Sequence, residues 1–294
     1  MNFENILNLS DAHSHFTSQK EIEFFFNLEK NKTTFFTCFC ANNIEENLQI
    51  EELKKNIEKL KPAEPIFQFE KVEKEKNKAK NLIFSSFGVH PMDLQMQNIE
   101  KINANLKILQ SLLVNKKINA IGEIGFDFRN AQFRNLKNFQ RNIFEQQLEL
   151  ATNFNLPIIV HNVKAVQILF EYANKMQKLP SVVFHCWGGT IEESLYFIKK
   201  DVNAYFSFGN NLLQGKKASI ECVKKLPKNC ILAESDFPFV KNYQNEKNTI
   251  CQIDAIKNVY KKLSEILKIN EREIIQNIYC NFCNAFCNSG TSSL

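Results

Sequence analysis

Eight short apolar runs recur along this chain of 294 residues, and longer stretches with helical character separate most of them. Most of the runs are continuously apolar rather than alternating, as strands buried on both faces of a parallel sheet should be. The predicted strands cover residues 5–9, 33–40, 81–89, 118–125, 156–161, 181–186, 203–209 and 230–236. Strands that alternate with helices predict an α/β fold, a (β/α)8 TIM barrel, and an open doubly wound sheet is the alternative.

Two of the intervening stretches carry clear helix signals. Residues 139–155 place their apolar side chains largely on one side, and Pro157 then introduces the next strand. Residues 189–200 open with Thr190, and Glu193 follows three positions later, which is the pattern of a capping box. Both stretches are therefore predicted to be helices.

A single barrel commonly occupies a chain of this length, so we expect one domain over residues 1–287. Residues 51–81 are rich in lysine and glutamate and form a charged excursion between the second and third strands. Because acids are interspersed throughout this excursion, it is better interpreted as a solvated helix face than as a nucleic-acid patch. A short polar tail is expected over residues 288–294.

The charge balance and the cysteines narrow the class of protein. The net charge of +5 is compatible with a polyanionic ligand but too small for a protein that coats nucleic acid. The first residues lack the pattern of a secretory signal, and no apolar run approaches the ~20 residues of a membrane helix. Nine cysteines, mostly in apolar runs, indicate buried thiols in a reducing compartment. We therefore expect a cytoplasmic protein with no membrane association and no obligate protein partner.

Side chains capable of chemistry gather at the ends of the predicted strands. All the histidines lie at the C-terminal end of a predicted strand or in the loop just after it, namely His13, His15, His90, His161 and His185. Glu123 and Asp236 end strands in the same way. These ends converge on one face of a barrel, which is where barrel active sites are built. The sequence therefore predicts that these side chains meet in one site.

This set of donors suits two divalent cations. Cations about 3.5–4 Å apart need a bridging carboxylate, imidazole ligands on both sides and room for a water between them. His13 and His15 can share one cation, because residues i and i+2 of an extended segment face the same way. Glu123, in the middle of the ring of strands, is placed to bridge the two cations.

The remaining donors can complete such a centre. His161 and His185 can hold the second cation, and Asp236 can close the first while it accepts a proton from the bridging water. A hydroxide made in this way would attack phosphorus or a carbonyl carbon at neutral pH. The sequence thus points to a metal-dependent hydrolase.

Seven motifs, in this order, resemble those of the TatD family of metal-dependent deoxyribonucleases: "DAHSHF", "FGVHPMDL", "AIGEIGFDF", "FEQQLELATNFNLPIIVHN", "VVFHCWGG", "YFSFG" and "LAESDFPFV". The similarity runs from about residue 9 to residue 240, with a weaker match at the terminal "NFCNAF". The resemblance implies a (β/α)8 barrel related to the amidohydrolases. It also implies hydrolysis of DNA phosphodiester bonds, of a single strand or from a 3′ end, with two divalent cations (Zn²⁺, Mn²⁺ or Mg²⁺).

The resemblance also assigns roles, residue by residue. It implies metal ligation by His13, His15, Glu123, His161, His185 and Asp236, of which Glu123 and Asp236 also take part in catalysis. His90, in the motif "GVHP", corresponds to a histidine near the substrate phosphate. Glu234 corresponds to an acid that would orient a ligand, and a structural salt-bridge role is the alternative.

The substrate-facing positions depart from the family pattern. Val163 and Gln167 stand where the family usually has an arginine and an acid. A hydrolase of a small amide, lactone or phosphoester that uses the same metal site is therefore an alternative function. A metal-containing binding protein with little turnover is a third hypothesis.

Two further features have simple structural interpretations. Trp187, the only tryptophan, could stack on a base, and it could equally pack at the rim. Cys280, Cys283 and Cys287 follow the i, i+3, i+7 spacing of one helix face, so we expect them in the core rather than in a metal site.

Overall fold

The computed structural model describes residues 7–16, 33–59, 83–96, 98–239, 244–245, 248–249 and 252–287. The C-terminal tail, 288–294, lies outside these residues, as does most of the charged excursion predicted over 51–81. Residues 51–59 of that excursion form the end of a helix. The expected boundaries of a single domain therefore stay a prediction.

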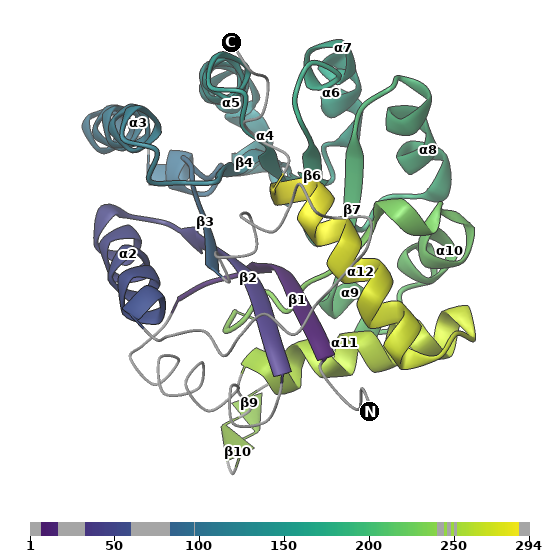
Figure 1. Ribbon diagram of the computed structural model, residues 1–294. Helices are drawn as coiled ribbons and strands as arrows, with labels where there is room; N and C mark the ends of the chain where they lie inside the picture. Colours follow the sequence, from purple (N-terminus) through teal and green to yellow (C-terminus); the bar gives the residue numbers. More distant parts are fainter. Residues whose placement is uncertain are drawn as a thin grey trace.

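Eight parallel strands form a nearly closed barrel, as the sequence predicts (Figure 1). They are β1 (Leu7–Ser14), β2 (Thr33–Ala41), β3 (Ile83–Phe87), β4 (Ala120–Asp127), β5 (Ile158–Val163), β6 (Val182–Phe184), β7 (Ala204–Phe208) and β8 (Ile231–Ala233). Each strand pairs with the next in the chain, from β1 to β8. The (β/α)8 barrel is confirmed over the open doubly wound sheet.

The seam between the last and first strands is joined by residues just beyond the end of β8 and residues at the C-terminal end of β1. The Asp236 N–H donates to the His13 carbonyl at 3.0 Å, and the His15 N–H donates to the Phe237 carbonyl at 2.8 Å. The loop after β8 is thereby fixed against the C-terminal end of β1. This seam brings two of the predicted metal-binding segments together.

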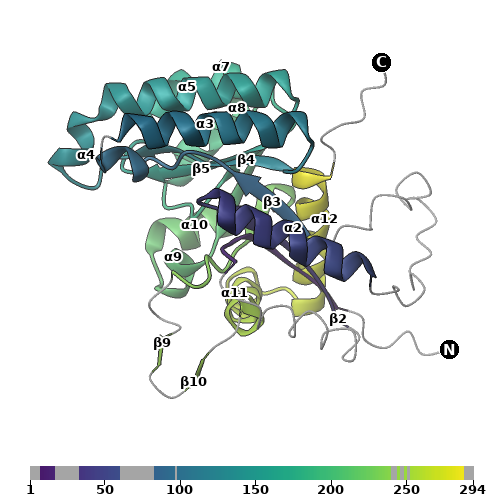
Figure 2. The ribbon, with the colours of Figure 1, turned by 90° about the vertical axis from the view of Figure 1, so that its left-hand side faces the viewer.

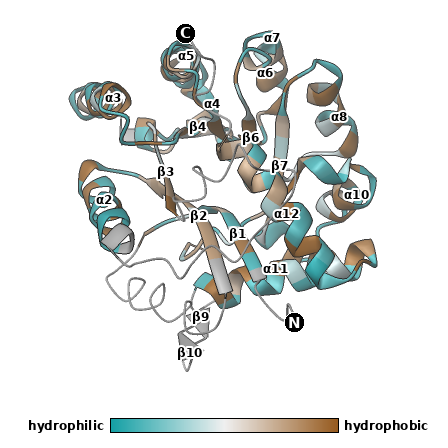
Figure 3. Cartoon of the chain, viewed as in Figure 1, coloured by the Kyte–Doolittle hydropathy of each residue, from teal (hydrophilic) through white to brown (hydrophobic). Residues whose placement is uncertain are grey.

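Helices surround the barrel (Figure 2). They are α2 (Ile44–Lys59), α3 (Ile99–Val114), α4 (Ala131–Asn135), α5 (Lys137–Asn153), α6 (Val166–Glu171), α7 (Ala173–Met176), α8 (Ile191–Lys199), α9 (Asn210–Leu213), α10 (Lys217–Lys225), α11 (Gln252–Leu267) and α12 (Glu271–Phe286). Two short 3-10 helices, η1 (Asp93–Met96) and η2 (Lys228–Cys230), and the hairpin strands β9 (Gln244–Asn245) and β10 (Asn248–Thr249) complete the described elements. Most of these helices show both brown and teal residues in Figure 3, as helices with one buried side should.

The two helices predicted from local signals are present. α5 covers most of the predicted stretch 139–155, and α8 lies within 189–200. The capping box of α8 is formed, because the Glu193 N–H donates to Thr190 Oγ1 at 3.2 Å and the Thr190 N–H donates to Glu193 Oε2 at 2.7 Å. The sequence signal for this helix start therefore corresponds to real hydrogen bonds.

The barrel interior and the last helix form one apolar cluster. Its strand residues are Ala12, Phe36, Cys38, Cys40, Phe84, Ala120, Ile159, Val183, Tyr205 and Leu232. Phe282, Ala285 and Phe286 of α12 pack against them, and Figure 1 shows α12 crossing the barrel. The Ser181 hydroxyl, just before β6, donates to the Ala285 carbonyl at 2.6 Å. Helix α12 therefore covers the end of the barrel at which the strands begin.

The structure shows how the cysteines of α12 and the single tryptophan are packed. The prediction that Cys280, Cys283 and Cys287 lie in the core is wrong for Cys280, which is exposed, while the other two are half-buried. The buried face of α12 is offset from them and carries Ile278 and Phe282 instead. Trp187 is buried, and its Nε1–H donates to Ser194 Oγ at 2.8 Å, so its ring packs in the core and does not face the rim.

No helix in the described part of the chain combines the length and the apolar character needed to cross a bilayer.

Candidate metal centre

The predicted site residues all lie at one end of the barrel. His13 lies in β1 and His15 directly follows it, while Glu123 is in β4 and His161 in β5. His185 directly follows β6, Asp236 comes three residues after β8, and His90 three residues after β3. Because all the strands are parallel, these positions share the C-terminal face of the barrel. Six different strands thus contribute to one centre.

Irregular pairing positions two of these side chains. The register of β1 against β2 shifts between Asp11 and Ser14, around His13, and that of β4 against β5 shifts between Ile121 and Ile124, around Glu123. Such bulges redirect side chains and are frequent beside active sites. Both bulges therefore occur where a strand must aim a donor at the centre.

Glu123 occupies the middle of the cluster. Its Oε1 lies 3.3 Å from His13 Nε2 and 3.5 Å from His15 Nε2. Its Oε2 lies 3.4 Å from His161 Nδ1 and 3.5 Å from His185 Nε2. The two carboxylate oxygens therefore face different imidazoles, Oε1 those of His13 and His15 and Oε2 those of His161, His185 and, at 3.6 Å, His90, which is the arrangement that a bridging ligand requires.

The charge of Glu123 is set by these neighbours. Burial alone would raise the pKa of its carboxyl, but the imidazoles of His13, His185 and His90 outweigh burial and hold that pKa well below its usual range. The carboxylate is therefore ionised at neutral pH and available to cations.

Asp236 stands on the His13 and His15 side of the centre. Its Oδ1 is 3.7 Å from the Nε2 atoms of both histidines, and its backbone has a φ of 51°. Burial raises the pKa of the Asp236 carboxyl to about 6, although His185 and His13 act in the opposite direction. Its side chain is still 22% exposed, so it faces both the histidines and the mouth of the barrel.

Glu234 fixes the ring of His185. The His185 Nδ1–H donates to Glu234 Oε2 at 3.0 Å, and the Cys186 N–H donates to Glu234 Oε1 at 2.7 Å. Burial would raise the pKa of Glu234, but the adjacent His185 outweighs it and lowers that pKa. Because Nδ1 carries the proton, His185 Nε2 presents a lone pair to the centre.

Asp127 acts on His161 in the same way, and it is a residue that the motif analysis missed. The His161 Nε2–H donates to Asp127 Oδ2 at 3.1 Å. The other nitrogen, Nδ1, is buried and has no hydrogen-bond partner among the described residues. A buried acceptor without a partner costs free energy unless a ligand binds its lone pair. The sequence signal that could have identified Asp127 is its position at the end of the strand that carries Glu123.

The partners of His15 and His13 come from β2 and from Asn42 just after it, whose side-chain Nδ2 lies 3.3 Å from His15 Nδ1. The His15 Nδ1–H donates to the Cys40 carbonyl at 3.1 Å, while His13 Nδ1 faces the Cys40 sulfur at 3.3 Å. The two Nε2 atoms are 3.2 Å apart and point to the same place. Both rings thus direct Nε2 toward Glu123 and Asp236.

His90 differs from the other four histidines. Its Nδ1 accepts the N–H of Met92 at 3.0 Å, so in the neutral ring the proton is on Nε2. That Nε2 lies 3.6 Å from Glu123 Oε2. Burial lowers the pKa of His90, which favours the neutral ring. His90 therefore faces the centre with a donor, whereas a metal ligand needs a lone pair.

Asp11, a second residue that the motif analysis missed, supports the seam between β8 and β1. Its buried carboxylate accepts the N–H of Ser235 at 2.9 Å and the side-chain amide of Gln252 at 3.0 Å. Burial raises the pKa of Asp11 to about 6. Asp11 thus holds the segment that carries Asp236 in place.

The donors fit divalent cations. Three groups of residues could each hold a cation, because the ligand atoms within each group lie within 4.8 Å of one another. The groups are His13, Glu123 and His185; His13, His15 and Asp236; and His90, Glu123 and His161. The unpartnered Nδ1 of His161 and the imidazole and carboxylate donors are what Zn²⁺ or Mn²⁺ prefers. The proton on His90 Nε2 removes that residue from the third group as a ligand.

The positions that depart from the family pattern lie beside this centre. Val163 ends β5 and pairs with Asp127 of β4, while Gln167 is exposed on α6. Arg129, two residues after Asp127, contacts the Asp127 carboxylate through Nε at 2.9 Å and also through Nη2. A guanidinium thus stands next to the strand position that Val163 occupies.

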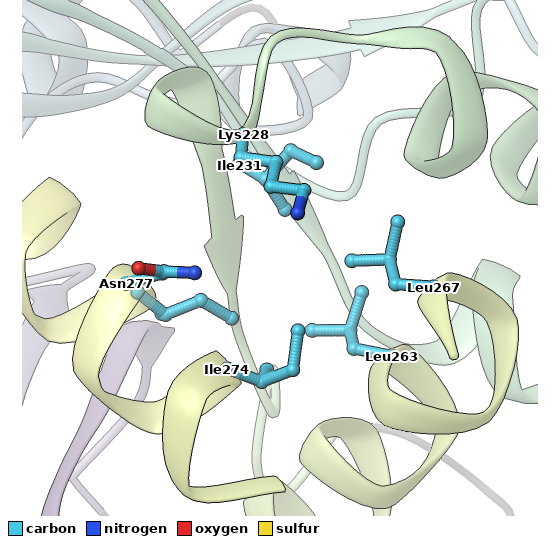
Figure 4. A pocket seen from close by; sticks show the side chains of 7 residues that line it. Lys228, Ile231, Leu263, Leu267, Ile274 and Asn277 are labelled. Carbon is cyan, nitrogen blue, oxygen red and sulfur yellow. The ribbon is translucent and has the colours of Figure 1, made fainter. Parts of the chain in front are cut away.

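An apolar pocket elsewhere is separate from the centre. It lies between α11, α12 and the start of β8, and Leu263, Leu267, Ile274 and Ile278 line it with Lys228 at its edge (Figure 4). These residues are on the side of the barrel covered by α12. The pocket therefore has no part in the chemistry described above.

Known proteins share this sequence pattern and this fold. A family model described as "TatD related DNase" matches residues 10–287. An uncharacterized metal-dependent hydrolase, YabD of Bacillus subtilis, is 28% identical over 198 residues, or 66% of this chain and 73% of that protein. The 3'-5' ssDNA/RNA exonuclease TatD of Pantoea ananatis is 34% identical over 113 residues, or 37% of this chain and 40% of that protein. The crystal structure of YJJV, a TatD homologue of Escherichia coli, has the same fold, with a TM-score of 0.72 at 20% identity over 95% of this chain and 98% of that one.

Proposed function

Because the chain belongs to the TatD-related DNase family and is a metal-dependent hydrolase, we propose that it cleaves phosphodiester bonds of DNA, in single strands or from a 3′ end, at this centre. The observation that carries the proposal is the Glu123 carboxylate, whose Oε1 faces the imidazoles of His13 and His15 while its Oε2 faces other imidazoles, those of His161 and His185 among them. The name of the Pantoea ananatis relative, an exonuclease of single-stranded DNA and RNA, supports a nucleic-acid substrate.

The centre would hold two divalent cations, Zn²⁺, Mn²⁺ or Mg²⁺. His13, His15 and Asp236 would bind one and His161 and His185 the other, with Glu123 between them. Cations bound in this way lower the pKa of water and neutralise charge on phosphate oxygens.

The residues around the centre would each perform one task. Asp236, with its raised pKa, is suited to take a proton from the attacking water at its exposed carboxylate. His90 offers its Nε2–H to a phosphate oxygen, because its Nδ1 is already held by Met92. Glu234 keeps His185 in the tautomer that exposes Nε2.

The test is a nuclease assay on metal-stripped protein resupplied with Mg²⁺, Mn²⁺ or Zn²⁺. We expect cleavage of an end-labelled single-stranded oligonucleotide with at least one cation, and a loss of about 10²–10⁴-fold in kcat for Asp236→Asn, because general bases contribute that much. Asp201→Asn is the matched control, since Asp201 is exposed and far along the chain from every donor.

Three outcomes would contradict the proposal. They are no cleavage of any nucleic acid with any cation, equal activity of Asp236→Asn and Asp201→Asn, and turnover confined to a panel of small amides, lactones and phosphoesters. The last outcome would favour the alternative substrate class at the same centre. Turnover by wild type equal to that of Glu123→Ala would favour a binding protein.

A cytoplasmic location is part of the same proposal. Its support is that Cys38, Cys40, Cys222 and Cys230 are buried as thiols, as is usual in a reducing compartment.

A further inference from the structure

An exposed aromatic ring stands at the mouth of the centre. The side chain of Phe239 is 64% exposed, although 27 phenylalanines give the chain an extensive buried aromatic core. Its ring centroid lies 4.7 Å from that of His15, with the planes at 77°. Exposing so large an apolar surface costs free energy. Core packing therefore does not account for this ring, whereas stacking on a ligand would.

A cationic group stands across the mouth from Phe239. Arg129 follows β4, and β4 lies opposite the seam of β8 and β1 in an eight-stranded ring. The side chain is 41% exposed, and Asp127 holds it through Nε and Nη2. Its Nη1 has no hydrogen-bond partner among the residues that the structure describes. The guanidinium also contacts Met92 Sδ through Nη2 at 3.5 Å and lies 5.3 Å from the centre of the Phe133 ring, so its position is fixed and Nη1 remains as a donor for a ligand.

The anchoring of Arg129 links it to the metal centre. The same Asp127 carboxylate accepts the Nε2–H of His161 at 3.1 Å. Asp127 also pairs in the sheet with Val163, so the guanidinium is supplied from β4 beside a β5 position that has no charge. One side of the mouth therefore carries a guanidinium with a donor that suits a phosphate, and the other carries an aromatic face that suits a base.

We propose that Phe239 and Arg129 form a nucleotide-binding site for single-stranded nucleic acid. A base next to the cleaved bond stacks on Phe239, and a phosphate on the other side of that bond contacts Arg129. Only an unpaired base exposes its face, so this site selects single strands over duplexes. The inference rests on the proposed nuclease function, because the two residues flank the centre that would cleave the strand.

The test compares two fluorescent single-stranded oligonucleotides, one complete and one with abasic residues, on metal-loaded protein. Phosphorothioate linkages keep both intact for equilibrium binding, and phosphodiester versions give KM and kcat. Phe239→Leu should weaken binding of the complete strand roughly 5- to 150-fold, the range expected for loss of one stacked base. The affinity of Phe239→Leu for the abasic strand should be unchanged. Phe239→Tyr, which keeps an aromatic ring, should bind the complete strand as tightly as wild type does.

Arg129→Gln provides the second arm. It should weaken binding of both strands alike and reduce the salt dependence of binding by about one phosphate contact. Phe154→Leu is the matched control, because Phe154 is also exposed but follows the last residue of α5. This control should bind both strands like wild type.

The inference and the proposed function fail in different ways. An equal effect of Phe239→Leu on complete and abasic strands, or none on either, would overturn the role of Phe239 even if the enzyme cleaves DNA. An unchanged salt dependence in Arg129→Gln would overturn the phosphate contact. Base-dependent binding without cleavage by wild type would contradict the nuclease function and leave the binding site in place.

Discussion

At the scale of single residues, the partner of one ring nitrogen decides what the other nitrogen of a histidine can do. Glu234 and Asp127 accept hydrogen bonds from one ring N–H of His185 and His161, so the other nitrogen of each neutral ring offers a lone pair to the centre. Met92 donates to His90, so that ring offers a proton instead. Histidines at similar strand ends therefore divide into those that offer a lone pair, as the proposed metal ligands must, and one that offers a donor.

Replacement of Glu234 by glutamine tests this division. The amide oxygen of Glu234→Gln can still accept from His185, but the negative charge that makes the imidazole a stronger ligand is lost. We expect metal affinity to fall about 10- to 100-fold, with activity recovered at high metal concentration. Metal competition titrations measure the first effect, and kcat at saturating metal measures the second.

The control for this experiment is Glu171→Gln, because Glu171 is exposed and paired with Arg141 at 2.7 Å. It should leave metal affinity unchanged. A loss of kcat that saturating metal does not repair in Glu234→Gln would show that Glu234 acts on substrate and does not orient a ligand.

Sequence motifs could predict the donors and one of their supports, Glu234, but not Asp127 or Asp11. His13 and Glu123 are recognisable because each stands near the C-terminal end of a strand. Asp127 and Asp11 contact partners 34 and 224 residues away, and no spacing along the chain encodes such contacts. The tautomer of His90 depends on one backbone N–H, which a motif does not reveal.

At the scale of secondary-structure elements, β5 approaches β4 very closely just after the bulge in β4. Gly125 has a φ of 144°, and a Cβ there would lie 2.0 Å from the His161 carbonyl oxygen. The two strands can approach only because this position lacks a side chain. Helix α12 illustrates the limit of periodicity, since Cys280 fits an apolar face by spacing and yet is exposed.

Gly125→Ala should therefore destabilise the protein by more than about 4 kcal/mol, a size that indicates a backbone clash in the core. Urea unfolding followed by circular dichroism measures the change. Gly215→Ala is the matched control, because Gly215 has a φ of 71° but no atom within 4 Å of the added Cβ. Its cost should be only about 1–2 kcal/mol, that of the left-handed conformation. Equal costs for the two variants would disprove the close approach.

At the scale of the whole molecule, strand and helix periodicity predicted the barrel. The end of the barrel at which the strands begin is covered by the last helix, which periodicity did not predict. Phe282 of α12 is fully buried, and its ring lies 5.3 Å from that of Phe84 in β3. Asn281 donates to the carbonyls of Lys228 and Ile231 at 2.7 and 2.8 Å. These contacts join the C-terminal helix to strands far away in the sequence, so local patterns could not predict them.

Phe282→Ala should lower the free energy of unfolding by about 3–5 kcal/mol, the usual cost of removing a buried phenylalanine. Denaturant titration at fixed metal concentration is the measurement. Ile99→Ala, on the exposed side of α3, should change stability by less than about 0.5 kcal/mol. A cost for Phe282→Ala as small as that of Ile99→Ala would mean that α12 does not close the barrel.

The cover formed by α12 determines from which end cations, water and substrate can enter the barrel. Within the described residues, the metal donors open only toward the C-terminal mouth, and the opposite end is filled by Phe282, Ala285 and Phe286. Cations, water, substrate and product would therefore share this one opening. If the proposed site binds a strand across it, that strand would cover the cations beneath, so occupancy of the substrate site and retention of metal would be linked.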